Sequence, residues 1–474
     1  MTQTHDLSAT RMATAVRTRE VSPVELTDHY LARIERLNEQ VGAYVTVTAE
    51  RAREEARRAE KAVTDAADPA DLPPLHGVPV PIKDLNMVNG VRITFGSAVY
   101  ADLTGFADDN VVAKLADAGT VLLGKTTTPE FGLPCYTEGD VSPPARTPWD
   151  TSRSAGGSSG GAAAAVASGL APVAQGSDGG GSIRIPSSAC GLFGIKPTRG
   201  RISQGPVIPD LFGLSTNGPI TRTVRDAALM LDVMSGHMPG DLFRAPEPDA
   251  PFLSHADRPP GRLRIARSLR PPVPDVEVHP DCVAAYEDAS ALLEELGHEI
   301  VDLPQVLGSD LVPHFATLWG VMATMTPVPE ESEHLLQPLT RHLRAYGDKT
   351  PAPKLFQAHA ALQGALRAAF PVMDEFDAIL HPTLAMPPVP IGYFHDLEPA
   401  ENFRRQTHFT PFCAMYNISG QPAVNVPLHW NEQGLPIGIM LAGRLGGEGT
   451  LISLSAQLEE ARPWIGRKPA VWTA

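Results

Sequence analysis

Residues 154–198 of the chain read SAGGSSGGAAAAVASGLAPVAQGSDGGGSIRIPSSACGLFGIKPT. Two glycine-rich loops, 156–161 and 179–181, flank an alanine-rich run and a short apolar segment. The run 162–170 predicts a closely packed helix, and 171–176 predicts a strand. A flexible linker is a poor explanation for a glycine loop that leads into such a helix. We therefore expect both loops to come close to other backbone or to a substrate.

The segments on either side of this stretch alternate between helical and strand-like patterns. Ser22 and Glu25 form a capping box with Pro23 between them, which predicts a helix that begins at Pro23. Further helices are expected at 50–63, 111–119 and 283–296. Strands are expected at 76–82, 120–124, 263–266, 378–380, 423–426 and 437–440. This alternation predicts an α/β fold.

Composition excludes several classes of protein. The chain has 39 Lys+Arg and 54 Asp+Glu, a net charge of −15, which argues against nucleic acid as a partner. Its four cysteines form no CxxC pair and its histidines form no HExxH motif, so we expect no disulfide framework, metal or cofactor. The first thirty residues lack an apolar signal segment, and no apolar run reaches 18 residues. We therefore expect a cytoplasmic protein with no membrane association.

The glycine loops leave two chemical interpretations open. Phosphate binding at a helix N-terminus is one, but neither GxxxxGK[ST] nor a GxGxxG in a strand-to-helix setting is present. Acyl transfer is the other, because Ser182 follows three glycines whose N–H groups could approach a carbonyl oxygen. Residues 156–160 match GxSxG around Ser158, but no strand-like segment precedes them. Lys83, which ends an apolar run and precedes Asp84, could act as the base if burial lowered its pKa.

Several further segments carry a family resemblance. They are 77–84 (GVPVPIKD), 124–132 (GKTTTPEFG), 156–161, 176–186, 194–198, 417–423 and 434–438. Together with their order, they make the sequence resemble the amidase signature family over nearly its whole length. The resemblance implies a large mixed β-sheet with helices on both faces and a peripheral substrate-facing subdomain. Because the matching segments run from both ends of the chain into one sheet, we expect one domain.

That domain is expected to have four parts. N-terminal helices occupy residues up to about 70, and a catalytic core follows over about 71–245. The peripheral subdomain covers about 246–373, a range rich in proline and arginine at its start. The chain then returns to the core sheet over about 374–474.

The resemblance also implies a Ser–cis-Ser–Lys catalytic triad. Ser182 would be the nucleophile, Ser158 the bridging serine 24 residues before it, and Lys83 the base. The backbone N–H groups expected to form the oxyanion hole are those of Gly179, Gly180, Gly181 and Ser182. The residues expected to support the site are Ser159, Asp178 and Arg184. Position 179 is commonly larger in the family, so the glycine here implies a wider pocket.

Two segments, 199–206 and 233–241, look like the branch that contains 6-aminohexanoate cyclic-dimer hydrolase. They imply a stand-alone amidase of small, largely apolar, non-peptide amides, with water as second substrate. Carbamate or ester hydrolysis by the same triad is an alternative, and a glutamine-dependent amidotransferase subunit is another. The protein is expected to be a monomer or a homodimer.

Met-, Phe- and Pro-rich stretches at 311–327 and 410–416 could line an apolar pocket, with ordinary core as the alternative. The candidate pocket residues are Thr127, Phe131, Cys135, Phe315, Trp319, Met322, Phe412 and Met415.

Overall fold

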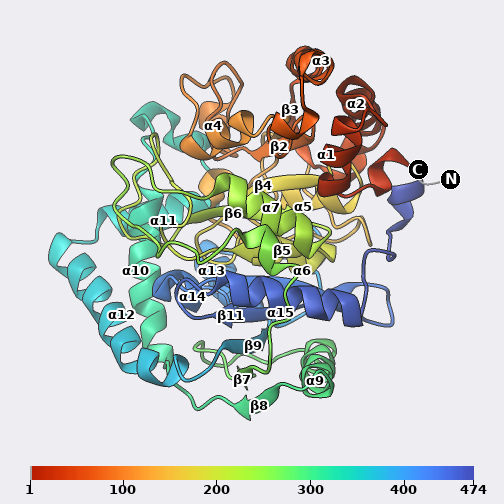
Figure 1. The fold of residues 1–474 in the computed structure, drawn as a ribbon. Helices are drawn as coiled ribbons and strands as arrows, with labels where there is room; N and C mark the ends of the chain where they lie inside the picture. The colour runs from red at the N-terminus through yellow and green to blue at the C-terminus, as the bar shows by residue number, and fades with distance from the viewer. Residues whose placement is uncertain (1–2) are drawn as a thin grey trace.

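Two β-sheets form the centre of the molecule in a computed structural model that describes residues 3–474 (Figure 1). The strands are β1 (Tyr44–Val47), β2 (Pro79–Lys83), β3 (Val121–Thr126), β4 (Val173–Asp178), β5 (Phe193–Lys196), β6 (Thr216–Thr221), β7 (Arg264–Arg267), β8 (Glu299–Asp302), β9 (Ala378–Pro382), β10 (Ala423–Trp430) and β11 (Pro436–Gly443). The larger sheet has the order β4-β6-β5-β10-β11-β9-β7-β8. Its strands pair antiparallel except for β9-β7-β8, which are parallel, so the sheet is mixed.

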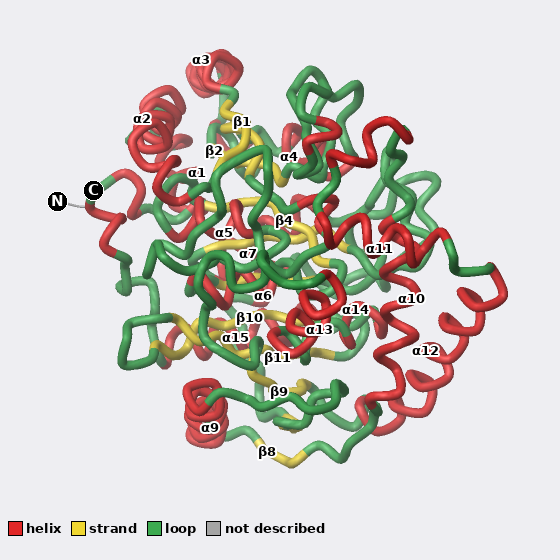
Figure 2. Tube along the Cα trace, turned by 180° about the vertical axis from the view of Figure 1, so that it is seen from behind, coloured by secondary structure: helices red, strands yellow, loops and turns green. Residues whose placement is uncertain are grey.

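Helices cover both faces of this sheet, so the expected fold class is confirmed. The helices are α1 (Ala9–Arg17), α2 (Pro23–Val41), α3 (Ala49–Asp65), α4 (Asn110–Asp117), α5 (Gly160–Ala167), α6 (Arg184–Cys190), α7 (Val224–Met234), α8 (Phe252–His255), α9 (Pro280–Glu295), α10 (Val312–Ala323), α11 (Pro338–Asp348), α12 (Ala352–Met373), α13 (Pro399–Phe409), α14 (Met415–Ser419) and α15 (Glu448–Ala461). Helices α7 and α15 lie on one face, and α5 and α6 on the other (Figures 1 and 2). Every residue of α5 is buried, because its glycines and alanines let the surrounding elements approach closely.

The smaller sheet, β1-β3-β2, lies beside β4 without joining it. The expectation that segments from both ends enter one sheet was therefore wrong. A side-chain hydrogen bond, and no backbone pairing, joins β2 to β4: Gln175 Oε1 accepts the N–H of Lys83 at 2.9 Å. The Gln175 amide group also donates to the side-chain oxygens of Asn86 and Asn217, each at 2.9 Å. This buried amide fixes the end of β2 against β4.

Helices α10, α11 and α12 pack on one another at the edge of the molecule and form what we call the helical cap (Figure 2). The expected peripheral subdomain began at about 246, but β7 and β8 lie within that range and extend the larger sheet. The part outside the sheet is therefore shorter than expected and begins near α10. Parallel pairing of β7 with β9 requires a long crossover, and the cap lies within it.

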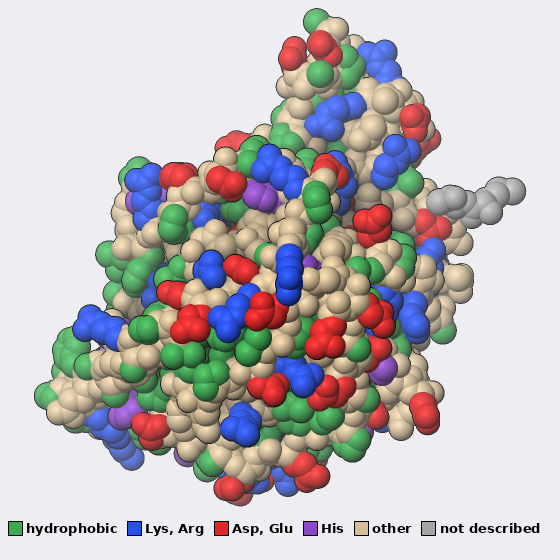
Figure 3. Space-filling view, turned by 60° about the horizontal axis from the view of Figure 1, so that its bottom comes forward, with side chains coloured by type: hydrophobic (Ala, Val, Ile, Leu, Met, Phe, Trp, Pro, Cys, Tyr) green, Lys and Arg blue, Asp and Glu red, His purple; other side chains and the backbone are tan. Residues whose placement is uncertain are grey.

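Acidic and basic side chains are mixed with apolar ones on the face shown in Figure 3. The net charge of −15 is thus not gathered into a single acidic region on this face. Within residues 3–474, none of the helices combines the length and apolar character needed to span a membrane.

Candidate active site

Lys83 is the last residue of β2, and its side chain is completely buried. Its Nζ lies 2.8 Å from Ser158 Oγ, 3.0 Å from Ser177 Oγ and 3.3 Å from the Ser177 carbonyl oxygen. These partners are uncharged, so no ion pair compensates for the loss of water around the ammonium group. Burial therefore lowers the pKa of Lys83 to about 7, against the opposing effect of Asp178. Near neutral pH, much of this amine is free to accept a proton.

The loop that carries Ser158 is held by close backbone packing. The Gly157–Ser158 peptide bond is cis. A Cβ on Gly157 would lie 2.7 Å from the Tyr136 carbonyl carbon, so only glycine fits there. The next residue, Ser159, is fully buried; its Oγ donates to the Ser177 carbonyl oxygen at 3.1 Å.

The two glycine loops meet at Ser182, which precedes α6. The Ser159 N–H donates to the Ser182 carbonyl oxygen at 3.2 Å, and this bond joins the two loops directly. The Ser182 side chain lines a pocket and is 6% exposed. A serine at the floor of a pocket, beside a loop that carries a lysine-paired serine, can act as a nucleophile once its proton is removed.

The buried carboxylate of Asp178 fixes the backbone around Ser182. It accepts the N–H of Gly181 at 2.7 Å and the N–H of Ile183 at 3.1 Å. It also forms a buried ion pair with Arg184, in which Nε and Nη2 each donate at 2.9 Å. Burial opposes ionisation of Asp178, but the ion pair outweighs it and holds the pKa of that carboxyl below its usual range.

Backbone donors remain free beside Ser182. Among residues 3–474, no hydrogen bond uses the N–H of Gly179, Gly180 or Ser182. The Gly181 N–H, which was expected to be an oxyanion donor, already donates to Asp178. The expectation is therefore corrected for Gly181. Glycine is required at this position by the backbone conformation and packing, because its φ is +128° and a Cβ would lie 2.7 Å from Cys413 Cβ.

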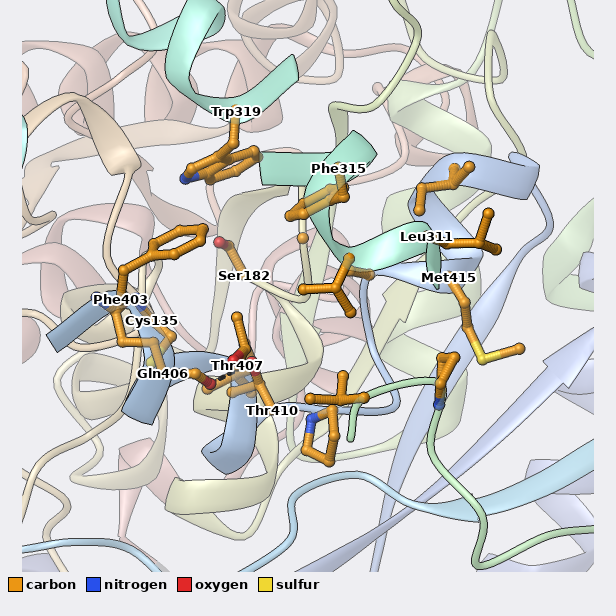
Figure 4. Close-up of a pocket in the computed structure, with 18 of the residues that line it drawn as sticks. Cys135, Ser182, Leu311, Phe315, Trp319, Phe403, Gln406, Thr407, Thr410 and Met415 are labelled. Atoms are coloured by element: carbon orange, nitrogen blue, oxygen red, sulfur yellow. Dashed lines mark hydrogen bonds between the residues drawn. The ribbon is translucent and has the colours of Figure 1, made fainter. Parts of the chain in front are cut away.

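The pocket above Ser182 lies between the helical cap and α13 (Figure 4). Phe315 and Trp319 of α10 stack with ring centroids 5.4 Å apart and form one wall. Phe403, Gln406 and Thr407 of α13 lie opposite. The residues that line the pocket are Leu133, Pro134, Cys135, Gly180, Ser182, Ile185, Pro272, Val273, Leu307, Leu311, Val312, Phe315, Trp319, Phe403, Gln406, Thr407, Thr410, Pro411, Ala414, Met415 and Ile418. None of these residues is charged.

Comparison with known proteins agrees with this geometry. The family model described as Amidase matches residues 25–452. 6-Aminohexanoate-cyclic-dimer hydrolase from Paenarthrobacter ureafaciens is 35% identical over 485 aligned residues, covering 97% of this chain and 96% of that protein. Acylamidase from Rhodococcus erythropolis is 35% identical and covers 98% of both chains. A solved structure of 6-aminohexanoate cyclic dimer hydrolase superposes with a TM-score of 0.91 at 32% identity, covering 99% of this chain and 100% of that one.

The chain belongs to the amidase signature family. It is a hydrolase that acts on amides, at carbon–nitrogen bonds other than peptide bonds.

Four of the candidate residues line this pocket: Cys135, Phe315, Trp319 and Met415. Burial raises the pKa of the Cys135 thiol well above its usual value, so it stays protonated and does not compete with Ser182 as a nucleophile.

The other four candidates lie outside the pocket lining. Thr127 is buried behind the loops, where the Gly161 N–H donates to its carbonyl oxygen. Phe412 is fully buried and stacks on His381 with centroids 5.3 Å apart. Met322 packs within the helical cap, and Phe131 lies near Tyr100 in a separate aromatic group.

Sequence reasoning missed the wall that α13 provides. Phe403, Gln406, Thr407 and Thr410 recur at helical spacing, whereas the charged Arg404 and Arg405 lie between them. This uncharged stripe was the available signal. The Gln406 side chain is held in place, because its Oε1 accepts the Cys135 N–H at 2.8 Å and its Nε2 donates to Asn402 Oδ1 at 2.5 Å.

Proposed function

We propose that this amidase hydrolyses small, uncharged, largely apolar, non-peptide amides through an acyl-enzyme on Ser182. The observation that carries the proposal is the buried Lys83 amine, 2.8 Å from Ser158 Oγ, beside a pocket that contains Ser182 and is lined by no charged residue of the described chain. Burying a charged substrate group there without a partner would cost several kcal/mol.

In the first half of the reaction, Ser182 Oγ attacks the amide carbon. Its proton passes to Ser158 Oγ as the Ser158 proton passes to the neutral Nζ of Lys83. The N–H groups of Gly179, Gly180 and Ser182 donate to the oxyanion, and each such donor is worth about 3 kcal/mol in the transition state. Asp178 and Arg184 hold this loop in shape without touching the substrate.

The tetrahedral intermediate then collapses as the carbon–nitrogen bond breaks. The proton returns from Lys83 through Ser158 to the nitrogen, and a neutral amine leaves. Water next attacks the acyl-enzyme ester, with the same groups accepting its proton and returning it to Ser182 Oγ. The products are a carboxylic acid and an amine, and the enzyme is regenerated.

Carbamates and esters could enter the same cycle, because the acyl-enzyme step needs only a carbonyl carbon and a leaving group. No charged residue of the described pocket lining distinguishes the three bonds. Gly179 does not provide the wider pocket expected there, because it is not part of this lining and a Cβ on it would lie 2.9 Å from Ser215 Oγ. Measuring kcat/KM for an amide, a carbamate and an ester that share the same apolar group would rank the three activities.

All four cysteines are free and buried, which supports our proposal of a cytoplasmic location.

The decisive experiment is covalent labelling with an alkyl fluorophosphonate, followed by peptide mass spectrometry. We expect one label per chain on Ser182, none in Ser182→Ala, and much slower labelling in Lys83→Ala. Hydrolysis of a neutral chromogenic amide should fall in parallel. Full labelling and activity in Lys83→Ala would refute the proposed base, and a label on another residue would refute the proposed nucleophile.

A further inference from the structure

A second cavity adjoins the pocket that contains Ser182. Its volume is about 260 Å³, and Ile418 of α14 lines both cavities. One face of α12, at the edge of the molecule in Figure 2, forms a wall, because its residues 359, 362, 363, 366, 367 and 370 recur at helical spacing. Leu214 and Leu318 lie on the apolar side of the cavity. A cavity of this size suits a small molecule.

The charged side chains of this cavity are both basic. Arg199 and Arg367 line it, and no acidic residue does. Within residues 3–474, neither arginine forms a salt bridge. His359 also lines the cavity and carries a ring N–H in either neutral tautomer. In a chain of net charge −15, an apolar cavity whose only charges are positive favours an anionic ligand.

Arg199, the first residue of the segment 199–206, is fixed in place by backbone groups. Its Nε donates to the Gly213 carbonyl oxygen at 2.5 Å, and its Nη2 donates to the carbonyl oxygens of Asn417 and Ile418, each at 2.8 Å. A Cβ on Gly213 would lie 2.5 Å from Arg199 Cδ, and a Cβ on Gly420 would lie 3.1 Å from Cζ, so both glycines leave room for this side chain. Across the described residues, Nη1 has no hydrogen-bond partner. One nitrogen of a pre-positioned guanidinium is therefore available to a ligand.

Carbonyl oxygens alone do not compensate for the charge of Arg199. Burial lowers the pKa of its guanidinium, and the charge of Asp210 only opposes this effect. The Asp210 carboxylate accepts the Gly213 N–H at 2.9 Å and is not part of the cavity lining. A carboxylate at Nη1 would supply the missing partner, and hydrogen bonds between two charged groups are the strong ones.

We propose that this cavity is a second ligand site, separate from the catalytic pocket, for a small carboxylate with an apolar body. The carboxylate accepts from Arg199 Nη1 and from the guanidinium of Arg367, and the apolar body packs against the leucines of α10 and α12. The site does not depend on the proposed function, although the proposed hydrolysis releases an acid of this class. Octanoate combines both features and is the probe.

The test is isothermal titration calorimetry with octanoate on enzyme that carries an alkyl fluorophosphonate on Ser182, because the label occupies the catalytic pocket. We expect one octanoate per labelled chain. Octanamide, which has the same length and no charge, should bind at least tenfold more weakly. Loss of octanoate binding on labelling would overturn the proposal, since the acid would then occupy the catalytic pocket only. Equal affinities for octanoate and octanamide would also overturn it.

Arg367→Gln tests the cavity directly, whereas replacement of Arg199 would also release α14. Arg367 is exposed, so the variant should melt at the native temperature and bind octanoate about three- to tenfold more weakly. Arg262→Gln is the matched control, because Arg262 is an exposed arginine outside the cavity, and its octanoate affinity should be native. Equal affinities in the two variants would refute the site. If fluorophosphonate does not label native protein, the proposed function has failed, and the two variants still test the cavity on unlabelled protein.

Discussion

Replacement of Lys83 by methionine should abolish turnover. It should also change stability with pH: the free energy of unfolding of the variant, minus that of the native enzyme, should increase as the pH falls from 10 to 7. Lys83 is fully buried, and burial lowers its pKa from 10.5 to about 7. Between these two pH values the unfolded chain binds this proton and the folded enzyme does not. The free energy of unfolding of the native enzyme therefore rises with pH across this window, and methionine removes that dependence.

The magnitude follows from the shift. The difference in unfolding free energy between the two proteins should change by about 1.4 kcal/mol per pH unit. Because the folded lysine at pH 7 and the unfolded lysine at pH 10.5 are half protonated, the slope is halved at both ends, and the total over the interval of 10.5 − 7 = 3.5 units is about 4 kcal/mol. The variant also loses the hydrogen bonds to Ser158 and Ser177, a cost of about 1 kcal/mol each. Folded Lys83 is mostly neutral across this window, so that cost stays nearly constant and the slope is the informative quantity.

Guanidinium unfolding of both proteins at pH 7, 8 and 9 would measure this slope. Other buried groups change charge in the same range: burial lowers the pKa of Lys196 to about 7 and raises that of Glu459 to about 7. Both residues are present in the two proteins, so their effects cancel in the difference. In parallel, log kcat/KM of the native enzyme should rise with unit slope up to about pH 7 and then level off. An unfolding difference that is the same at every pH would refute a neutral buried Lys83.

Three further changes test other parts of the site. Ser182→Ala should lower kcat/KM at least 10³-fold with an unchanged circular dichroism spectrum; residual activity near the native value would identify another nucleophile. Asp178→Asn should lower the unfolding free energy by about 3–5 kcal/mol in urea titrations, because buried Arg184 loses its charged partner; a loss below 1 kcal/mol would contradict this. An amide with a terminal ammonium on its acyl chain should show at least tenfold lower kcat/KM than a neutral isostere, because no charged residue lines the described pocket. Equal rates would place that chain outside the pocket.

Local sequence rules predicted where many elements lie but less well where they end. The capping box was confirmed, because Ser22 Oγ accepts the N–H groups of Val24 and Glu25 and α2 begins at Pro23. By contrast, the strand expected to end at 124 continues through Lys125 as β3. A lysine suggests a strand end when read alone, but this one is buried in an ion pair with Asp84. Its partner is 41 residues away in the sequence, where no local rule reaches.

The same reason limits prediction of the pocket. The glycine loops were informative because close backbone approach restricts residue type, as at Gly157 beside Tyr136. Apolar residues such as Phe412 and Met415 carry no comparable signal, since core and pocket wall use the same side chains. Only the packing of the helical cap and α13 decides that Met415 lines the cavity while Phe412 stacks on His381.

The adjacent pair Lys83 and Asp84 shows how the fold makes a base from a residue that would otherwise be an ordinary cation. Asp84 lies in the turn that follows β2, and its carboxylate forms a buried ion pair with Lys125 at 3.0 Å instead of with Lys83. The Thr94 N–H and Oγ donate to the other oxygen of Asp84, at 2.9 and 2.6 Å. The other carboxylate that acts on Lys83 is that of Asp178, which raises its pKa, and this carboxylate forms an ion pair with Arg184. Each acid close to Lys83 thus has its own cation, and that division leaves Lys83 among hydroxyl groups, where burial can keep it neutral.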